Sequence, residues 1–277
     1  MAISEKVELL GKHCYAGKNI PDVLTVKSIP TASELEYVAA EDFDETMLSE
    51  ILPKAVEEKI DFNQLLEIDY QWLLRCLRIV NYGPYHTTNA IYCSKCGRVN
   101  GEYRVDLQSV PCKPLPNNFN GEVVISRNEF LDYKQDIKLR MLTIREVLNC
   151  EKDSQFVDKS GKTNHSLARL CYMIKSMGTD TTLTPIEVRL KLLNDFSAAD
   201  YAILKDLERQ CTDYGLRAGG SCSCPKCGQE GATFIALVDD RYFRPTLGDL
   251  RAWKTDRDKR KVEDAAGNKT TNVRKHS

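Results

Sequence analysis

The sequence predicts an α+β chain that is predominantly helical, consists of two related halves and ends in an extended C-terminal arm. Three observations lead to this fold class: apolar residues at helical spacing, two short cysteine motifs that each precede a strand-like run, and an order of features that recurs along the chain. The 277 residues are 42% hydrophobic, which is enough for one large domain or two modest ones. The same composition argues against a disordered chain.

The two halves are predicted from features that recur at a nearly constant interval. Asp69-Tyr70 is followed after 131 residues by Asp200-Tyr201, and Tyr82-Gly83 is followed after 132 residues by Tyr214-Gly215. Within each half, apolar residues recur at steps of three and four positions, which indicates an amphipathic helix. Each Tyr-Gly pair is a natural helix end, because glycine readily adopts the left-handed conformation found there. We therefore expect an internal duplication.

Local signals place the boundaries of these halves. Residues 111–120 are rich in proline and asparagine, a composition that ends regular structure. The predicted units are a first half over 1–116, a second half over 117–250 and a polar tail over 251–277. In the second half, Thr143 and Thr184 are each followed three residues later by a glutamate. This pattern is the capping box that starts a helix.

Four of the eleven cysteines form two matching motifs. Cys93-Ser94-Lys95-Cys96-Gly97 and Cys224-Pro225-Lys226-Cys227-Gly228 share the pattern C-x-K-C-G, and each is followed by polar residues and a strand-like run. This is the pattern of a zinc knuckle, a tight turn in which glycine supplies the unusual backbone angle. Two knuckles complete a tetrahedral Cys₄ site. The lysine in each motif would offset the charge of about −2 that four thiolates leave on Zn²⁺.

The separation of the two motifs leaves alternatives open. They lie 131 residues apart, much farther than the ~15–20 residues of a compact zinc site. The alternatives are two unrelated knuckles, a thiol redox pair, or an iron–sulfur cluster. A redox pair usually begins a helix after a strand, whereas both motifs here precede a turn and a strand. We therefore expect a structural metal at Cys93, Cys96, Cys224 and Cys227, with zinc favoured over an iron–sulfur cluster.

The charge pattern separates the C-terminal tail from the rest of the chain. The formal net charge is −1. Residues 251–277 contain nine basic and four acidic residues, so the tail carries +5 and the remainder −6. Few apolar residues follow Trp253, so we expect this tail not to fold alone. Such an arm either improves solubility or becomes ordered on an acidic protein partner.

The motifs give little support to an enzyme. Ser160-Gly161-Lys162-Thr163 resembles the end of a phosphate-binding loop, but Phe156 stands where that loop needs glycine. The four histidines lie far apart. No apolar stretch approaches the ~20 residues of a membrane helix, and no secretory signal is apparent. We expect a soluble, non-enzymatic protein made in a reducing cytosol, with no membrane partner.

The order of these features resembles the T4-type bacteriophage baseplate proteins, a family of hub subunits and hub-assembly proteins of contractile tails. The resemblance covers roughly residues 20–246 and rests on the Asp-Tyr helix, its Tyr-Gly end, the two C-x-x-C-G knuckles and the closing Tyr242-Phe243-Arg244-Pro245. It implies that the four knuckle cysteines are the metal or structural cysteines. It also implies that residues 242–245 close the fold or dock on the hub.

The resemblance implies a virion protein that acts by protein–protein interaction. It would be retained in the tail baseplate, act in the host cytoplasm during assembly, or both, and would contact hub, tail-tube or tape-measure proteins in a symmetric, oligomeric assembly. The leading alternative is a zinc-ribbon module that binds nucleic acid, although the acidic body disfavours it. A thiol redox enzyme is a third hypothesis.

Overall fold

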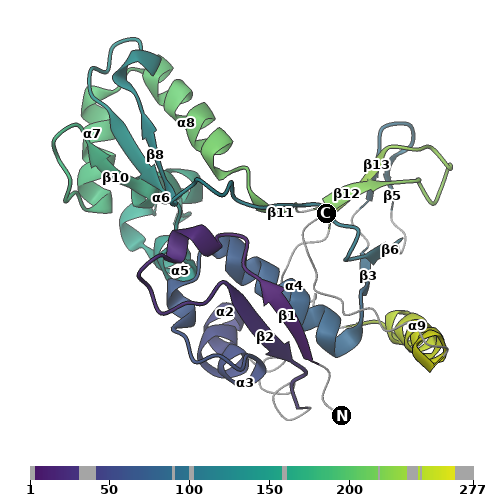
Figure 1. The fold of residues 1–277 in the computed structure, drawn as a ribbon. Coiled ribbons are helices and arrows are strands. Elements are labelled where there is room, and N and C mark those ends of the chain that lie inside the picture. The colour runs from purple at the N-terminus through teal and green to yellow at the C-terminus, as the bar shows by residue number, and fades with distance from the viewer. Residues whose placement is uncertain are drawn as a thin grey trace.

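The computed structural model describes residues 4–30, 42–88, 91–99, 103–157, 161–217, 219–235, 243 and 245–265. The described elements form three parts, which we call the first lobe, the ribbon and the second lobe (Figure 1). The second lobe is inserted between the two hairpins of the ribbon, so the chain enters the ribbon twice. None of the helices in these ranges has the length and apolar composition that crossing a membrane requires.

The first lobe is organised around one long helix. Its elements are β1 (Ser4–Glu8), β2 (Val23–Lys27), α2 (Phe43–Thr46), α3 (Leu52–Ala55) and α4 (Glu67–Tyr82). The antiparallel β1–β2 pair and the short helices cover α4, most of whose side chains are buried. Helix α4 ends at Gly83, whose φ of 79° is the left-handed conformation that the Tyr-Gly motif predicts.

The second lobe has its own sheet and its own apolar core. The sheet has the strand order β10-β9-β8 and is antiparallel. Its elements are β8 (Glu122–Ile125), β9 (Ile137–Arg140), α5 (Ile144–Lys152), α6 (His165–Met173), β10 (Ile174–Met177), α7 (Pro185–Asp195) and α8 (Ala198–Thr212). Helices α5 and α7 begin with the predicted capping boxes at Thr143 and Thr184.

The ribbon is a four-stranded sheet assembled from two distant hairpins. Its strand order is β12-β13-β4-β5, with β4 (Ile91–Cys93), β5 (Gly97–Val99), β12 (Gly219–Cys222) and β13 (Ala232–Ile235). Two further antiparallel pairs connect it to the lobes. These pairs are β3 (Tyr85–Thr88) with β6 (Tyr103–Asp106), and β7 (Cys112–Lys113) with β11 (Gly215–Leu216).

The chain returns from the ribbon to the first lobe and forms α9 (Leu247–Ala265). Asp249 at the start of α9 is buried and accepts a hydrogen bond from the Thr87 hydroxyl at 2.8 Å. The Tyr85 hydroxyl donates to Asp256 at 2.6 Å. Trp253 packs so closely on Gly83 that a Cβ at Gly83 would lie 2.2 Å from the indole ring. These contacts attach α9 to the end of α4 and to β3.

The predicted fold class is wrong in three respects. The chain is mixed α/β, with 44% of the described residues in helices and 23% in strands, so helices do not predominate. The two halves, each predicted to end in a knuckle, are not similar units: the first has a two-stranded sheet and the second a three-stranded one, while the two knuckles lie together in a third sheet. Residues 247–265 form a helix, so the C-terminal segment is not an extended arm up to that point.

Candidate metal centre

The four predicted cysteines gather at one end of the ribbon. The hairpin β4–β5 carries Cys93 and Cys96, and the turn between β12 and β13 carries Cys224 and Cys227. Strand β13 pairs with β4 through Phe234 opposite Ile91, which places the two turns side by side. The four Sγ atoms all lie within 4.8 Å of one another. Strand pairing in the ribbon therefore brings together two cysteine motifs that lie 131 residues apart in the sequence.

Each knuckle turn is built by the residues between and after its cysteines. Gly97 and Gly228 follow the second cysteine of each turn and have φ angles of 77° and 70°, which favour glycine. In the second knuckle, the Gly228 N–H donates to the Cys224 carbonyl at 2.8 Å, and the Cys224 N–H donates to the Gln229 carbonyl at 2.8 Å. The shared C-x-K-C-G pattern thus corresponds to a shared turn geometry.

The same turns direct backbone N–H groups at the first thiol of each knuckle. For Cys224, burial raises the pKa, but the N–H groups of Cys227 and Lys226 outweigh it and bring the pKa to about 7. The N–H of Cys96 lowers the pKa of the Cys93 thiol. Burial raises the pKa of the Cys96 thiol to about 12. The thiols of Cys93 and Cys224 therefore ionise more readily than an ordinary thiol, and a divalent cation would displace the protons that remain on the cluster.

The spacing of the sulfurs fits a tetrahedral metal and not disulfides. The Sγ atoms of Cys93 and Cys227 are 3.8 Å apart, and those of Cys96 and Cys224 are 3.6 Å apart. Zn–S bonds of about 2.3 Å in a tetrahedron place the sulfurs about 3.8 Å apart, whereas a disulfide bond is about 2.05 Å long. Four thiolates fill the coordination sphere, as structural zinc sites require, and no position is left for substrate or water.

Each knuckle turn carries the lysine that its motif contains. Lys95 and Lys226 lie in the knuckle turns and are exposed. Their ammonium groups would partly offset the −2 charge of a Zn(Cys)₄ centre. Cys222 is buried on β12 opposite Ala232, and it does not belong to the group of four thiols that approach one another.

The structure describes part of the predicted partner-binding segment. Phe243 is 1% exposed, and its ring centroid lies 5.8 Å from that of Phe43 in the first lobe. Pro245 is half-buried just before α9. Tyr242 and Arg244 lie outside the described residues. Phe243 thus contributes to the core of this chain.

Two buried carboxylates were not identified as functional groups from the sequence, although the Asp-Tyr repeat marked their positions. Asp69 accepts hydrogen bonds from the N–H of Leu10 at 2.5 Å and from the Tyr15 hydroxyl at 2.6 Å. Asp200 accepts from the N–H of Leu131 at 2.6 Å and of Tyr133 at 3.0 Å. Both carboxylates hold loops to helices, and neither belongs to the thiol cluster.

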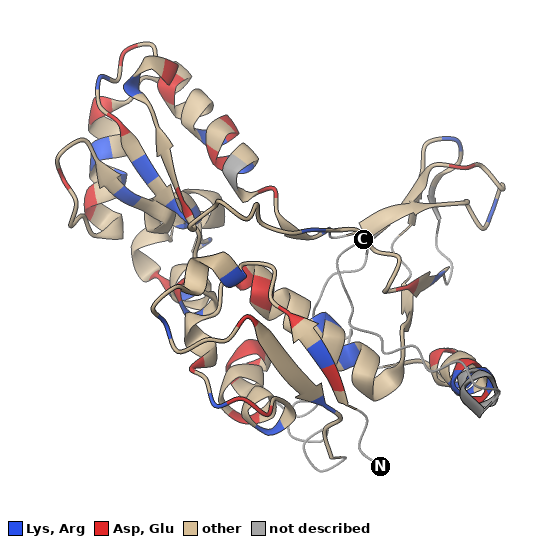
Figure 2. Cartoon of the chain, viewed as in Figure 1, with Lys and Arg blue, Asp and Glu red and all other residues tan. Residues whose placement is uncertain are grey.

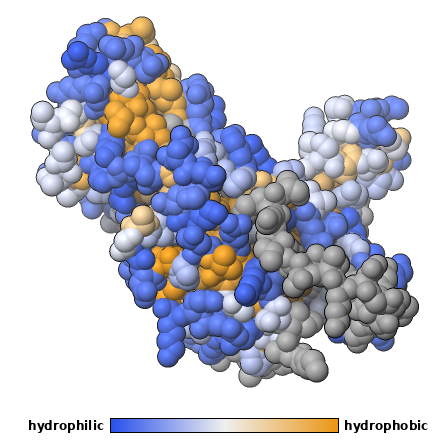
Figure 3. Space-filling view, in the orientation of Figure 1, coloured by the Kyte–Doolittle hydropathy of each residue, from blue (hydrophilic) through white to orange (hydrophobic). Residues whose placement is uncertain are grey.

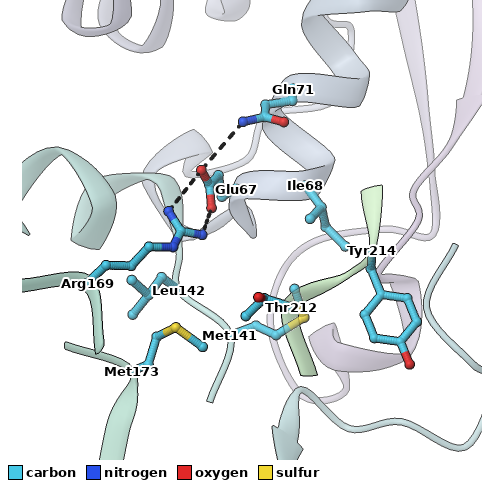
Figure 4. Close-up of a pocket in the computed structure, with 9 residues that line it drawn as sticks. All are labelled: Glu67, Ile68, Gln71, Met141, Leu142, Arg169, Met173, Thr212 and Tyr214. Carbon is cyan, nitrogen blue, oxygen red and sulfur yellow. Dashed lines mark hydrogen bonds and ion pairs between the residues drawn. The ribbon is translucent and has the colours of Figure 1, made fainter. Parts of the chain in front are cut away.

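A cavity of about 150 Å³ lies where the two lobes meet (Figure 4). Its polar wall is an ion pair between Glu67 on α4 and Arg169 on α6, and Gln71 donates to the same carboxylate at 3.4 Å. The apolar wall includes Met141 and Met173. Because the two charges neutralise each other across the junction, we interpret this site as a contact between lobes.

Comparison of the chain with protein-family models, curated proteins and solved structures finds no match.

Proposed function

We propose that the protein is a structural or assembly component of the hub region of a contractile phage tail baseplate, acting through protein–protein contacts and stabilised by a structural zinc clip. The observation that carries the proposal is the gathering of Cys93, Cys96, Cys224 and Cys227 within 4.8 Å. A closed Cys₄ set suits a structural metal, because it leaves no coordination position for chemistry. The order of sequence motifs supplies the link to the baseplate family.

The position of the four cysteines in the chain indicates how a bound zinc ion would stabilise the fold. The chain leaves the ribbon after β5, forms the whole second lobe, and returns to the ribbon at β12. A metal that joins the two hairpins therefore closes a loop containing that lobe. In the chain-entropy treatment, a cross-link over a loop of ~100 residues contributes about 5 kcal/mol of stability. The clip would keep the second lobe at a defined orientation for other hub proteins.

The metal clip is tested on the purified protein. Elemental analysis is expected to find one zinc per chain, and Cys96→Ser is expected to lose it. Cys14→Ser is the matched control, since this thiol lies outside the cluster and contacts the Phe119 carbonyl at 3.7 Å. One iron–sulfur cluster per chain, or no metal in a folded, zinc-supplemented protein, would contradict the proposal.

The assembly role is tested in host cells infected by the virus whose genome encodes this chain. Deletion is expected to stop tail assembly at the hub, with rescue by Cys14→Ser and none by Cys96→Ser. If tails form normally without the protein, and it is present neither in tails nor in hub intermediates, the baseplate proposal is wrong.

One observation favours nucleic-acid binding as a second candidate function. Tyr92 is 61% exposed on the outer face of the ribbon, opposite Thr233, where a base could stack. Arg104 on β6, however, is directed to Asp249, with 3.7 Å between Nε and the carboxylate oxygen. Salt-dependent binding of single-stranded DNA that Tyr92→Ala weakens would favour this alternative.

A further inference from the structure

The second lobe has a sheet face opposite its apolar core that belongs neither to the metal centre nor to the 150 Å³ cavity. Strand alternation directs Ile125, Ile137, Leu139, Ile174 and Met177 into the core of the lobe. The intervening positions point outward. We call this outer surface the cationic face, and define it by Glu122, Val124, Lys138, Arg140 and Lys175.

Cations outnumber carboxylates on this face and beside it. Glu122 is bridged by Lys138 and Lys175, and Arg140 pairs with Glu146 at 2.5 Å. Lys18 reaches the same region from the first lobe, and no carboxylate lies within ion-pair distance of it among the described residues. The region therefore contains four cations and two carboxylates, namely Lys18, Lys138, Arg140 and Lys175 with Glu122 and Glu146. Figure 2 shows basic positions along the strands of this lobe.

A cavity of about 560 Å³ continues the face into the space between the lobes. Lys18, Glu122, Arg140 and Lys175 line it, together with the Thr143 and Tyr172 side chains. This volume is in the range of protein binding pockets. A ligand lying along the sheet would therefore find a recess at the end of β8 that also carries positive charge.

The face also has an apolar position on its edge strand, β8. Val124 is 62% exposed and lies opposite Lys138 on the neighbouring strand. Strand β8 is at the edge of its sheet, where an extended chain can add by backbone hydrogen bonds. In Figure 3 the second lobe presents an apolar area surrounded by hydrophilic residues.

We propose that the cationic face binds an extended acidic segment of a partner protein, with carboxylates on the cations and an apolar side chain on Val124. A peptide suits the face better than a nucleic acid, because an exposed valine offers nothing to phosphates and no exposed aromatic ring stands among the residues that define the face. The inference deepens the proposed function, because it supplies a partner chemistry for a protein that acts by protein contacts.

The test measures binding of a labelled peptide to the full-length, metal-loaded chain at low salt. The peptide carries glutamates and one valine at every second position, separated by serine, so that all of them project from one side of an extended chain. Lys138→Gln and Lys175→Gln are each expected to weaken binding about threefold to tenfold. Glu122→Gln is expected to tighten it about threefold, because it removes the carboxylate that competes with the ligand. Lys191→Gln on α7 is the matched control, since Lys191 pairs with Asp180 at 2.7 Å and neither defines the face nor lines its cavity.

Three outcomes would overturn the inference. These are equal binding of a neutral glutamine–valine peptide, equal or tighter binding of single-stranded DNA, and absence of peptide binding at low salt. A gain of affinity in Glu122→Gln cannot arise from misfolding, so the test does not depend on variants that lose function. If the purified chain contains no metal but still binds the peptide, the proposed zinc site is wrong and this inference about the cationic face still holds.

Discussion

The two lobes bury the same residue at the same place in their long helices and give it different surroundings. Asp69 is the third residue of α4, and Asp200 is the third residue of α8. Each accepts N–H groups from the loop between the first two strands of its own lobe, namely Leu10 and Gly11 for Asp69 and residues 131–133 for Asp200. In both lobes the carboxylate attaches a loop to a helix.

The difference lies in how well the negative charge is compensated. Burial raises the pKa of Asp69 to about 6, and the Tyr15 hydroxyl and two N–H donors only partly offset it. Burial acts in the same direction on Asp200, but the N–H groups of Leu131, Tyr133 and Asp132 outweigh it and lower the pKa below its ordinary value. The same Asp-Tyr motif therefore contains a carboxylate that is costly to ionise at Asp69 and one that ionises readily at Asp200.

The largest effect is expected for Asp69→Ala. This change leaves the N–H groups of Leu10 and Gly11 and the Tyr15 hydroxyl without their acceptor in a dry environment. Unsatisfied buried donors cost about 1–3 kcal/mol each, so we expect a loss of about 4 kcal/mol in the free energy of unfolding. Urea unfolding measures it. Asp213→Ala, at an exposed ion pair with Arg217, is the control and should change stability by less than about 1 kcal/mol.

The next effect is a pH dependence of opposite sign in the two lobes. The pKa of Asp69 is about 6 in the folded state, and its ordinary value is 3.8. Between pH 3.8 and pH 6, the folded state therefore keeps a proton on Asp69 that the unfolded state has lost. Its contribution to stability is present below pH ~4 and is lost as the pH rises through ~6, a change of about 3 kcal/mol. Asp200 stabilises the folded state above its ordinary pKa, and this contribution is lost as the pH falls through its lowered value.

Stability measured from pH 3 to 7 for the parent chain, Asp69→Asn and Asp200→Asn separates these contributions. The fall in stability between pH 4 and 6 should disappear in Asp69→Asn and persist in Asp200→Asn. Equal pH profiles for the two variants would show that the carboxylates do not differ as the comparison requires.

The smallest effect is expected for Asp200→Ala. Its bonds to the N–H groups of Leu131 and Asp132 are only partly buried, so water can replace the lost acceptor. We expect a loss of about 2 kcal/mol, with faster amide exchange confined to residues 131–133 and the adjoining strands. If Asp200→Ala lowers the free energy of unfolding as much as Asp69→Ala does, the N–H donors of the two loops are equally inaccessible to water.

The candidate metal centre could be predicted from the sequence because its chemistry is local. A C-x-K-C-G turn contains both thiols, the N–H donors and the glycine within five residues, so the pattern alone indicates a knuckle. Helix starts at Thr143 and Thr184 were predicted for the same reason, since a capping box satisfies its own donors within one turn.

The fold class was wrong because the strands carry too little periodic signal. Most strands in the described ranges have two to four residues, as in β4 and β11. An alternating pattern needs about four to eight residues to be recognised. The recurring Asp-Tyr and Tyr-Gly motifs indicated similar halves, yet the sheets around them differ in strand number and pairing.

The sequence by itself determined the two knuckle turns, the end of α4 at Gly83 and the charge contrast between body and tail, because each depends on neighbouring residues. The predicted helix end at Tyr214-Gly215 was wrong, because α8 ends at Thr212 and Gly215 begins β11. Only the tertiary structure decided that β13 pairs with β4, that the four thiols meet, and that Asp69 and Asp200 differ in pKa. These features depend on segments far apart in the chain. Their free energies come from long-range strand pairing and burial, which no short motif encodes.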